Sequence, residues 1–214
     1  AQVGEQRATI SDLFGEKPTT FRNTELILDN RICQQVEDLG FSAMLGEGFE
    51  RVLGWRSPQV PYHPRGCRRL KLLLRSYSLS DDIAFRFSNR AWKEWPLSAE
   101  KFAHWVNQIN GDGYCCNLFM DYETFGEHQW KETGIFDFME HLPAEVLKDA
   151  RFRFRTPSEV AEANPAVAEL DFPHPISWAD AERDVTAWLG NPMQRSANDA
   201  LYSLARSVRK LERA

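Results

Sequence analysis

Short apolar runs bounded by turn residues predict four strands along the chain. Three of them lie in the first half, at residues 19–27, 41–45 and 70–76. The fourth, residues 114–120, is almost continuously apolar and follows a turn segment that contains two glycines. An uninterrupted apolar run of this kind is typical of a parallel strand that is buried on both faces.

Apolar residues at helical spacing lie between these strands. One helix is predicted over residues 30–39 and a second over 98–109, where Ser98 is the expected N-terminal cap. A third is predicted over residues 134–139, with a new start at residue 144. Strands that alternate with helices favour a parallel α/β sheet or barrel.

The pattern changes after about residue 150. Residues 151–155 alternate arginine and phenylalanine, as in one short strand, and a helix is predicted to begin at residue 156. Two more helices are predicted, over residues 177–190 and 197–213. We therefore expect two units, an α/β unit over residues 1–150 and a helical region over residues 151–214.

Composition excludes several classes of protein. The chain has 214 residues, of which 43% are hydrophobic and 27% charged, as in an ordinary globular domain. A net charge of −5 gives no basic footprint for nucleic acid, and no apolar run approaches the roughly 18 residues that a membrane span needs. The four cysteines show no CxxC spacing, which favours reduced thiols, no structural metal and a cytoplasmic location.

Aromatic residues are abundant, with seven Trp, five Tyr and fourteen Phe. They serve either as bulk for the core or as flat plates that line a cleft. Aromatic plates beside carboxylates suit sugar rings, which have an apolar face and a polar rim.

Acidic residues gather directly after the apolar run 114–120. Asp121, Glu123, Glu127 and His128 follow it within eight residues. The carboxyl ends of parallel strands form the active face of a barrel, where partial desolvation raises a carboxyl pKa toward useful acid strength. Asp121 is therefore a candidate general acid, and a solvated surface loop is the alternative interpretation.

A second candidate carboxylate, Glu25, lies at the predicted end of the first strand, close to Arg22 and Asn23. Arg22 would hold Glu25 in the ionised form that a nucleophile needs, although a structural salt bridge has the same pattern. Glycosidic bond cleavage requires two carboxyl groups in different protonation states. Glu25 and Asp121 are a candidate pair of this kind.

Two other segments carry candidate sugar-binding residues. Asp81 and Asp82 follow the third predicted strand and either bind sugar hydroxyls or cap a short helix. The segment 177–190 offers two tryptophans and several acids, which either face a cleft or belong to a capped helix with its tryptophans in the core.

Four segments occur in an order that resembles glycoside hydrolase family 57, specifically its α-amylase-like branch. They are Phe-Arg-Asn-Thr-Glu-Leu-Ile, Leu-Ser-Asp-Asp-Ile-Ala-Phe-Arg-Phe-Ser, Met-Asp-Tyr-Glu-Thr-Phe-Gly-Glu-His and Trp-Leu-Gly-Asn-Pro-Met-Gln, within residues 19–194. The resemblance implies part of an incomplete (β/α)7 barrel followed by a C-terminal helical region. It also implies retaining cleavage of α-1,4-glucans such as starch, glycogen or maltodextrin, with no metal or cofactor in the chemistry.

Carried over to this chain, the resemblance makes Glu25 the nucleophile and Asp121 the general acid/base. It also places the segment 180–188 in a motif that contributes sugar contacts. The complete set of expected substrate-binding residues is Arg22, Asp81, Asp82, Glu123, His128, Trp130, Trp178, Asp180, Asp184 and Trp188.

The chain also departs from the family pattern. It lacks the family's first motif, a His-Gln-Pro, and its second, since no histidine precedes His63. It offers about four strands where the family's barrel has seven, so we expect it to be the C-terminal part of a longer enzyme and to be inactive if isolated from the missing strands. Alternatives are a 4-α-glucanotransferase with the same residues, a non-catalytic glucan-binding fragment, and a metal-dependent hydrolase using Asp121, Glu123 and His128. The last is disfavoured because no two histidines lie four or fewer residues apart.

Overall fold

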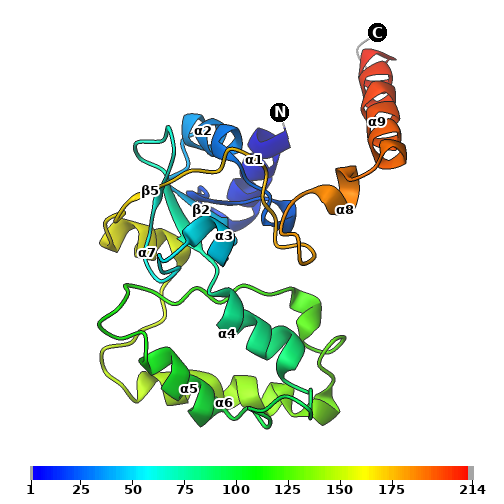
Figure 1. Ribbon diagram of the computed structural model, residues 1–214. Coiled ribbons are helices and arrows are strands. Elements are labelled where there is room, and N and C mark those ends of the chain that lie inside the picture. Colours follow the sequence, from blue (N-terminus) through cyan, green and yellow to red (C-terminus); the bar gives the residue numbers. More distant parts are fainter. Residues whose placement is uncertain (1, 212–214) are drawn as a thin grey trace.

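The computed structural model describes residues 2–211, and its centre is a parallel sheet of three strands (Figure 1). The order is β1 (Thr20–Arg22), β2 (Ala43–Gly46), β4 (Lys71–Leu74), with β2 in the middle. Helix α2 (Asn30–Asp38) connects β1 to β2. The short helix α3 (Glu50–Leu53) and strand β3 (His63–Pro64) connect β2 to β4. Strands that alternate with helices make this part an α/β structure, as predicted.

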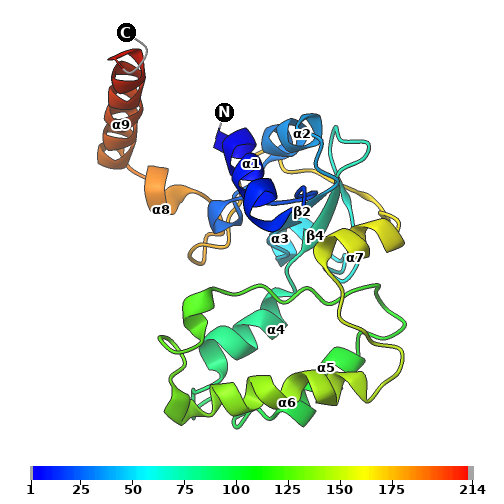
Figure 2. The same cartoon turned by 180° about the vertical axis from the view of Figure 1, so that it is seen from behind.

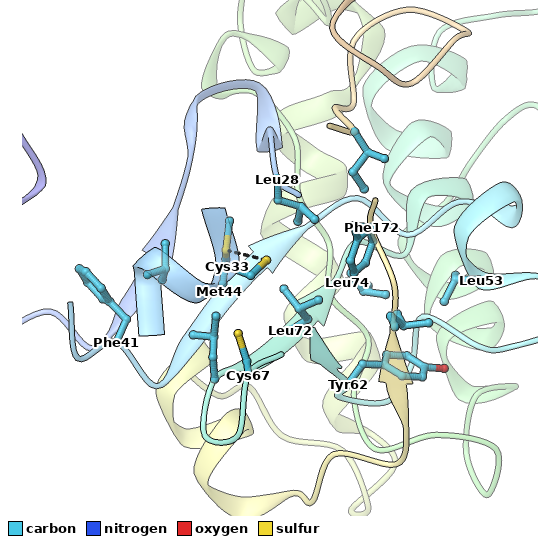
Figure 3. Packing of buried hydrophobic residues seen from close by; sticks show 14 of the residues in the cluster. Leu28, Cys33, Phe41, Met44, Leu53, Tyr62, Cys67, Leu72, Leu74 and Phe172 are labelled. Carbon is cyan, nitrogen blue, oxygen red and sulfur yellow. Dashed lines mark hydrogen bonds between the residues drawn. The ribbon is translucent and has the colours of Figure 1, made fainter. Parts of the chain in front are cut away.

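Apolar side chains of the sheet and of α2 meet in the main core (Figure 3). Met44 of β2 and Leu72 of β4 face each other in register and are fully buried. Helix α2 begins where the Asp29 carboxylate accepts the N–H of Ile32 at 2.7 Å, and it turns Cys33 toward the sheet. The core fixes the sheet, and therefore fixes the positions at which its strands end.

A second core lies in a separate group of helices, drawn below the sheet in Figures 1 and 2. Its elements are α4 (Tyr77–Asp81), the π-helical turn η2 (Asp82–Arg86), α5 (Ala99–Asn107) and α6 (Ile135–Leu147). The ring of Phe102 on α5 meets that of Phe138 on α6 edge to face, with centroids 5.8 Å apart. The Ser98 side chain accepts the N–H of Lys101 and caps α5, which confirms the predicted start of this helix.

After α6 the chain returns to the sheet. Helix α7 (Pro157–Ala163) starts at a capping box of Thr156 and Glu159, and its last carbonyls accept hydrogen bonds from the Lys71 ammonium. Strand β5 (Glu169–Leu170) then pairs in parallel with β3. Residues on both sides of position 150 therefore pair with each other, while the division into two units at that position stays a prediction.

Three more helices lie toward the ends of the described chain. Helix α1 (Gln2–Phe14), which the hydrophobic pattern does not predict, lies beside α2 (Figures 1 and 2). The short helix α8 (Thr186–Leu189) leads into α9 (Pro192–Leu211), which projects from the rest of the chain and has no buried residue (Figures 1 and 2). Helix α9 begins five residues earlier than predicted, and the last predicted residues of this helix lie outside the described part. Across residues 2–211, no helix is both long and apolar enough to cross a membrane.

The strand predicted over residues 114–120 is wrong. The structure gives this segment no regular secondary structure, although most of its side chains are half-buried. Strand β4 ends at Leu74, and the Asn117 side chain donates to the Leu74 carbonyl at 3.0 Å, so the segment meets the end of this strand and does not run along its edge. The Asn117 carbonyl accepts the N–H of Ser76, and the N–H of Phe119 donates to the hydroxyl of Ser80. Such single contacts do not form a ladder.

Other boundaries also differ from the prediction. The first strand ends at Arg22, because the Asn23 side chain accepts the N–H of Thr24 and opens a turn of 3₁₀ helix over Thr24–Leu26. Helix α6 runs without a break through Pro143, since its apolar face packs on α5. The arginine–phenylalanine segment 151–155 is not a strand.

The helix predicted from residue 177 is also wrong over its first half. Residues 177–184 form a loop, in which Asp180 and Arg183 take left-handed backbone angles, with φ of 52° and 53°. Only Thr186–Leu189 are helical. This loop returns to the sheet at the ends of its strands, and it contributes to the site described next.

Candidate active site

A cavity of about 490 Å³ opens where the chain leaves the carboxyl ends of the parallel strands. Glu25 reaches it from the turn after β1, and Arg75 reaches it as the first residue after β4. Asp121 and His128 line it from the segment that follows residues 114–120, and Trp178 lines it from the loop 177–184. Four stretches that are distant in sequence therefore meet around one space.

Glu25 is held by both its backbone and its side chain. Its φ of 51° places it in the left-handed region, and Leu26 follows with a φ of 50°. The indole N–H of Trp178 donates to Oε2 of Glu25 at 3.0 Å, and the backbone N–H of Trp178 donates to the Glu25 carbonyl at 3.1 Å. Among residues 2–211, no group donates a hydrogen bond to Oε1 of Glu25, so this oxygen keeps its lone pairs available.

Asp121 lies at the start of the 3₁₀ turn Tyr122–Thr124 and is exposed. Its pKa is raised above the ordinary value, first by partial burial and then by repulsion from Glu123 and Glu25. Arg22 and His128 act in the opposite direction. A carboxyl group with a raised pKa keeps its proton to a higher pH, which is what a general acid requires.

Two carboxylates and two guanidinium groups form a charge network beside the cavity. Arg75 binds Glu47 through Nη1 at 3.2 Å and Asp81 through Nη2 at 2.5 Å. Arg183 binds the same two acids, at 2.6 Å from Glu47 Oε2 and 3.7 Å from Asp81 Oδ2. The formal charges balance, as burial of Glu47 and Arg75 requires. The pKa of Glu47 is raised overall, because the effect of burial exceeds the lowering by Arg75, the Gly48 N–H and Arg183.

The network also reaches the segment that carries Asp121. Nε of Arg75 donates to the carbonyl oxygen of Phe119 at 2.7 Å, two residues before Asp121. The Arg75 guanidinium carbon also lies 5.5 Å from the centre of the Trp178 ring. Within residues 2–211, no three His, Cys, Asp or Glu side chains are grouped so that they could hold a metal ion.

Residues 1–173 match the family model described as glycosyl hydrolase family 57, which is well over half of the chain. The chain belongs to glycosyl hydrolase family 57. A relative named "Putative alpha-amylase", from Methanocaldococcus jannaschii, is 48% identical over 208 residues. That alignment covers 95% of this family 57 chain and 43% of the relative, so the chain spans less than half of the relative's length.

Two solved structures share the fold. A 4-alpha-glucanotransferase from Thermococcus litoralis superposes with a TM-score of 0.60 at 15% identity, over 79% of this chain and 26% of that one. A GH57 branching enzyme from Thermococcus kodakaraensis also has a TM-score of 0.60, at 16% identity over 87% of this chain and 47% of that one. At such identities, the likeness concerns the fold of the family 57 chain and not its residues.

About half of the predicted site residues line the cavity. Besides Glu25 and Asp121, the side chain of Asp81 lines it, although its oxygens already bind Arg75 and Arg183. The remaining predicted residues that line it are His128, Trp178 and Asp180.

The other predicted residues lie outside the cavity lining. Arg22 is exposed at its edge, with the guanidinium carbon 5.1 Å from the centre of the Trp178 ring, and Glu123 is exposed beside Asp121. Asp82 binds Arg86 at 2.6 Å, and Asp184 accepts hydrogen bonds from the N–H and hydroxyl of Thr186, so both make local structural contacts. The two remaining tryptophans, Trp130 and Trp188, are exposed elsewhere.

The sequence interpretation missed four residues at this site. Glu47 and Arg75 both stand directly after a sheet strand, so the rule that found Glu25 and Asp121 could also have found them. Phe85 lines the cavity with 68% of its surface exposed, yet the sequence interpretation considered only the acids of that segment. Arg183 carries no local signal, because its partner Glu47 lies 136 residues earlier.

Proposed function

We propose that the protein acts on α-1,4-glucans by a retaining double-displacement mechanism, with Glu25 as nucleophile and Asp121 as general acid/base. One observation carries the proposal. Glu25 and Asp121 line the same cavity in different settings, Glu25 fixed by Trp178 with one oxygen open and Asp121 exposed with a raised pKa. Two carboxyl groups with separate roles are what glycoside cleavage needs.

In the first step of the proposed reaction, Asp121 gives its proton to the glycosidic oxygen. Oε1 of Glu25 attacks the anomeric carbon, the bond to the leaving sugar breaks, and a glycosyl ester forms on Glu25. In the second step, ionised Asp121 takes a proton from an acceptor hydroxyl. The acceptor oxygen attacks the anomeric carbon and releases the Glu25 carboxylate, so the configuration is retained after two inversions.

The acceptor decides between the two activities that this site supports. Water gives hydrolysis, and the hydroxyl of a second sugar gives transfer. The relative that is 48% identical is named as an amylase, whereas the two solved structures are a glucanotransferase and a branching enzyme. Transfer is therefore the second candidate function, and it uses the same two carboxylates.

The lining of the cavity fits a sugar. Trp178 and the exposed ring of Phe85 offer apolar surfaces for the faces of glucose units, while His128 and Asp180 offer polar atoms for hydroxyl groups. We infer that the three parallel strands are part of the (β/α)7 barrel that the family resemblance implies. Under this proposal, residues from the other strands of that barrel complete the cavity.

The proposal is tested on the complete polypeptide, meaning this chain with whatever residues its gene encodes on either side. Purified protein is incubated with maltoheptaose, and products are separated by length over time. Shorter oligosaccharides alone indicate hydrolysis, and products both shorter and longer than the substrate indicate transfer. Binding of maltoheptaose without any product would refute the proposal and favour a non-catalytic glucan-binding protein.

A further inference from the structure

Two strained segments meet at the cavity. Within residues 2–211, four residues other than glycine have left-handed backbone angles: Glu25, Leu26, Asp180 and Arg183. The first two belong to the turn after β1 and the other two to the loop 177–184. Such angles persist only where surrounding contacts hold them, and they gather at functional sites. The contacts that hold the loop 177–184 therefore bear on the position of Glu25.

Arg183 supplies several of these contacts. Its Nη1 donates to Oε2 of Glu47 at 2.6 Å and to the Trp178 carbonyl at 3.1 Å, and its own carbonyl accepts the N–H of Ser177 at 3.1 Å. One guanidinium group thus ties both ends of the loop to a buried carboxylate. Oε1 of Glu47 accepts the N–H of Gly48 at 2.8 Å, so the anchor is fixed at the end of β2.

The loop in turn sets the position of the Trp178 indole. The Trp178 N–H donates to Oε2 of Glu25, and the guanidinium carbons of Arg22 and Arg75 lie 5.1 and 5.5 Å from the centre of its ring. Hydrogen bonds therefore connect Glu47 to Arg183 and Arg183 to the Trp178 carbonyl, and the indole N–H of the same tryptophan donates to the carboxylate of Glu25.

We propose that Arg183 is a positioning residue, which clamps the loop 177–184 onto Glu47 and thereby holds the Trp178 indole N–H against Glu25. The kinetic part of this inference rests on the proposed function, in which Glu25 is the nucleophile. Arg75 remains bound to Glu47 when Arg183 is replaced, so the replacement does not leave the buried carboxylate without a cation.

A double-mutant cycle tests whether Arg183 acts through Trp178. The variants are Trp178→Phe, which keeps a ring and loses the N–H, Arg183→Met, and the double variant. Each single change is expected to lower kcat by about 10- to 100-fold, with KM changed by less than about threefold. The kcat of the double variant is expected to lie no more than about threefold below that of the less active single variant, because both changes break the same chain of contacts.

Arg51 offers a matched control. Its Nη2 donates to the carbonyl of Glu182 at 3.0 Å, so it touches the same loop without reaching Glu47. Arg51→Met is expected to keep kcat within about twofold of wild type, as for a surface contact. Arg183→Lys keeps the charge but lacks the planar fork, so its kcat should fall between those of wild type and Arg183→Met. Losses that multiply in the double variant would show that Arg183 acts independently of Trp178, and an effect mainly on KM would show that Arg183 binds substrate directly; either result overturns the inference.

A second measurement does not depend on activity. In a ¹H–¹⁵N spectrum of the complete polypeptide, the Trp178 indole signal is identified as the one that Trp178→Phe removes. Arg183→Met should speed hydrogen exchange of this indole about tenfold or more, while Arg51→Met leaves it unchanged, with native circular dichroism in both. An unchanged Trp178 indole in folded Arg183→Met, or in Arg183→Lys if the methionine variant does not fold, overturns the inference.

The two proposals fail in different ways. A wild-type protein without activity on maltoheptaose refutes the proposed function, and the exchange measurement still decides whether Arg183 holds Trp178. An active wild-type protein with multiplicative losses in the cycle leaves the proposed function intact and refutes the role of Arg183.

Discussion

The two carboxylates at the cavity differ in how they are held. Glu25 has a left-handed backbone and receives hydrogen bonds from two N–H groups of Trp178. Asp121 is exposed, and within residues 2–211 its carboxylate makes no hydrogen bond, so its pKa is set by partial burial and then by nearby charges. A nucleophile must meet one carbon atom in one direction, whereas a general acid must exchange protons with two groups in turn. The contrast in restraint thus fits the two proposed roles.

The largest effect is expected for loss of the fixed carboxylate. Glu25→Gln should lower kcat on maltoheptaose by roughly 10⁴- to 10⁶-fold, because the amide cannot form the glycosyl ester. Initial rates of product formation by the complete polypeptide measure this. An activated aryl α-glucoside should show a comparable loss, since a better leaving group does not replace a nucleophile. Activity within tenfold of wild type would contradict the assignment.

Asp121→Asn should have a smaller effect that depends on the substrate. Loss of a general acid costs about 10²- to 10⁴-fold on maltoheptaose, whose leaving oxygen needs a proton. For an aryl α-glucoside with an acidic phenol as leaving group, formation of the glycosyl ester should be nearly as fast as in wild type, as followed by the burst of released phenol. If the rate of this first step fell equally for both substrates, Asp121 would not act as a general acid distinct from the nucleophile Glu25.

The surroundings of Asp121 predict a shift of the pH profile. The charge of Glu123 helps to raise the pKa of Asp121, so Glu123→Gln should lower that pKa. The protonated acid is then lost at a lower pH, and the alkaline side of the kcat/KM profile should move toward lower pH. Arg22→Gln should move it the opposite way, since Arg22 lowers the same pKa. Shifts in the same direction for both variants would show that another group controls this side of the profile.

The smallest expected effect is on stability. Because the pKa of Asp121 is raised in the folded protein, its stabilising contribution is present at low pH and is lost as pH rises through the folded pKa. At neutral pH the ionised Asp121 is less favourable in the folded than in the unfolded protein. Asp121→Asn removes this charge and should raise the free energy of unfolding, by no more than about 0.5 kcal/mol for an exposed position. Urea unfolding of the variant and wild type measures the difference, and a marked loss of stability would show that Asp121 has a structural role.

The sequence predicts where the candidate site lies better than it predicts the secondary structure that supports the site. Glu25 and Asp121 follow from one rule, that functional residues stand after parallel strands, and both line the cavity. Asp121 lines the cavity even though residues 114–120 are not a strand, because the apolar, half-buried segment still leads the chain to the cavity. Whether such a segment pairs as a strand depends on whether a neighbouring strand has a free edge, and the composition of the segment does not reveal this.

The loop 177–184 shows why the rest could not be predicted. Ser177 and Asp180 have the spacing of a helix start, and local propensity favours a helix there. The ion pair between Arg183 and Glu47 overrides this preference, and it joins residues that are 136 positions apart. In the same way, the sequence leaves both sugar binding and helix capping open for Asp81, and it does not indicate that the Asp81 oxygens bind Arg75 and Arg183.

The most direct test of the account is to trap the glycosyl ester. The complete polypeptide is treated with a fluorinated α-glucosyl fluoride, which reacts in the first step and turns over slowly in the second, and its peptides are analysed by mass spectrometry. The account predicts one added sugar on the peptide that contains Glu25, and none in Glu25→Gln. An adduct on a different carboxylate of the wild-type protein, or a product of inverted configuration, would contradict it.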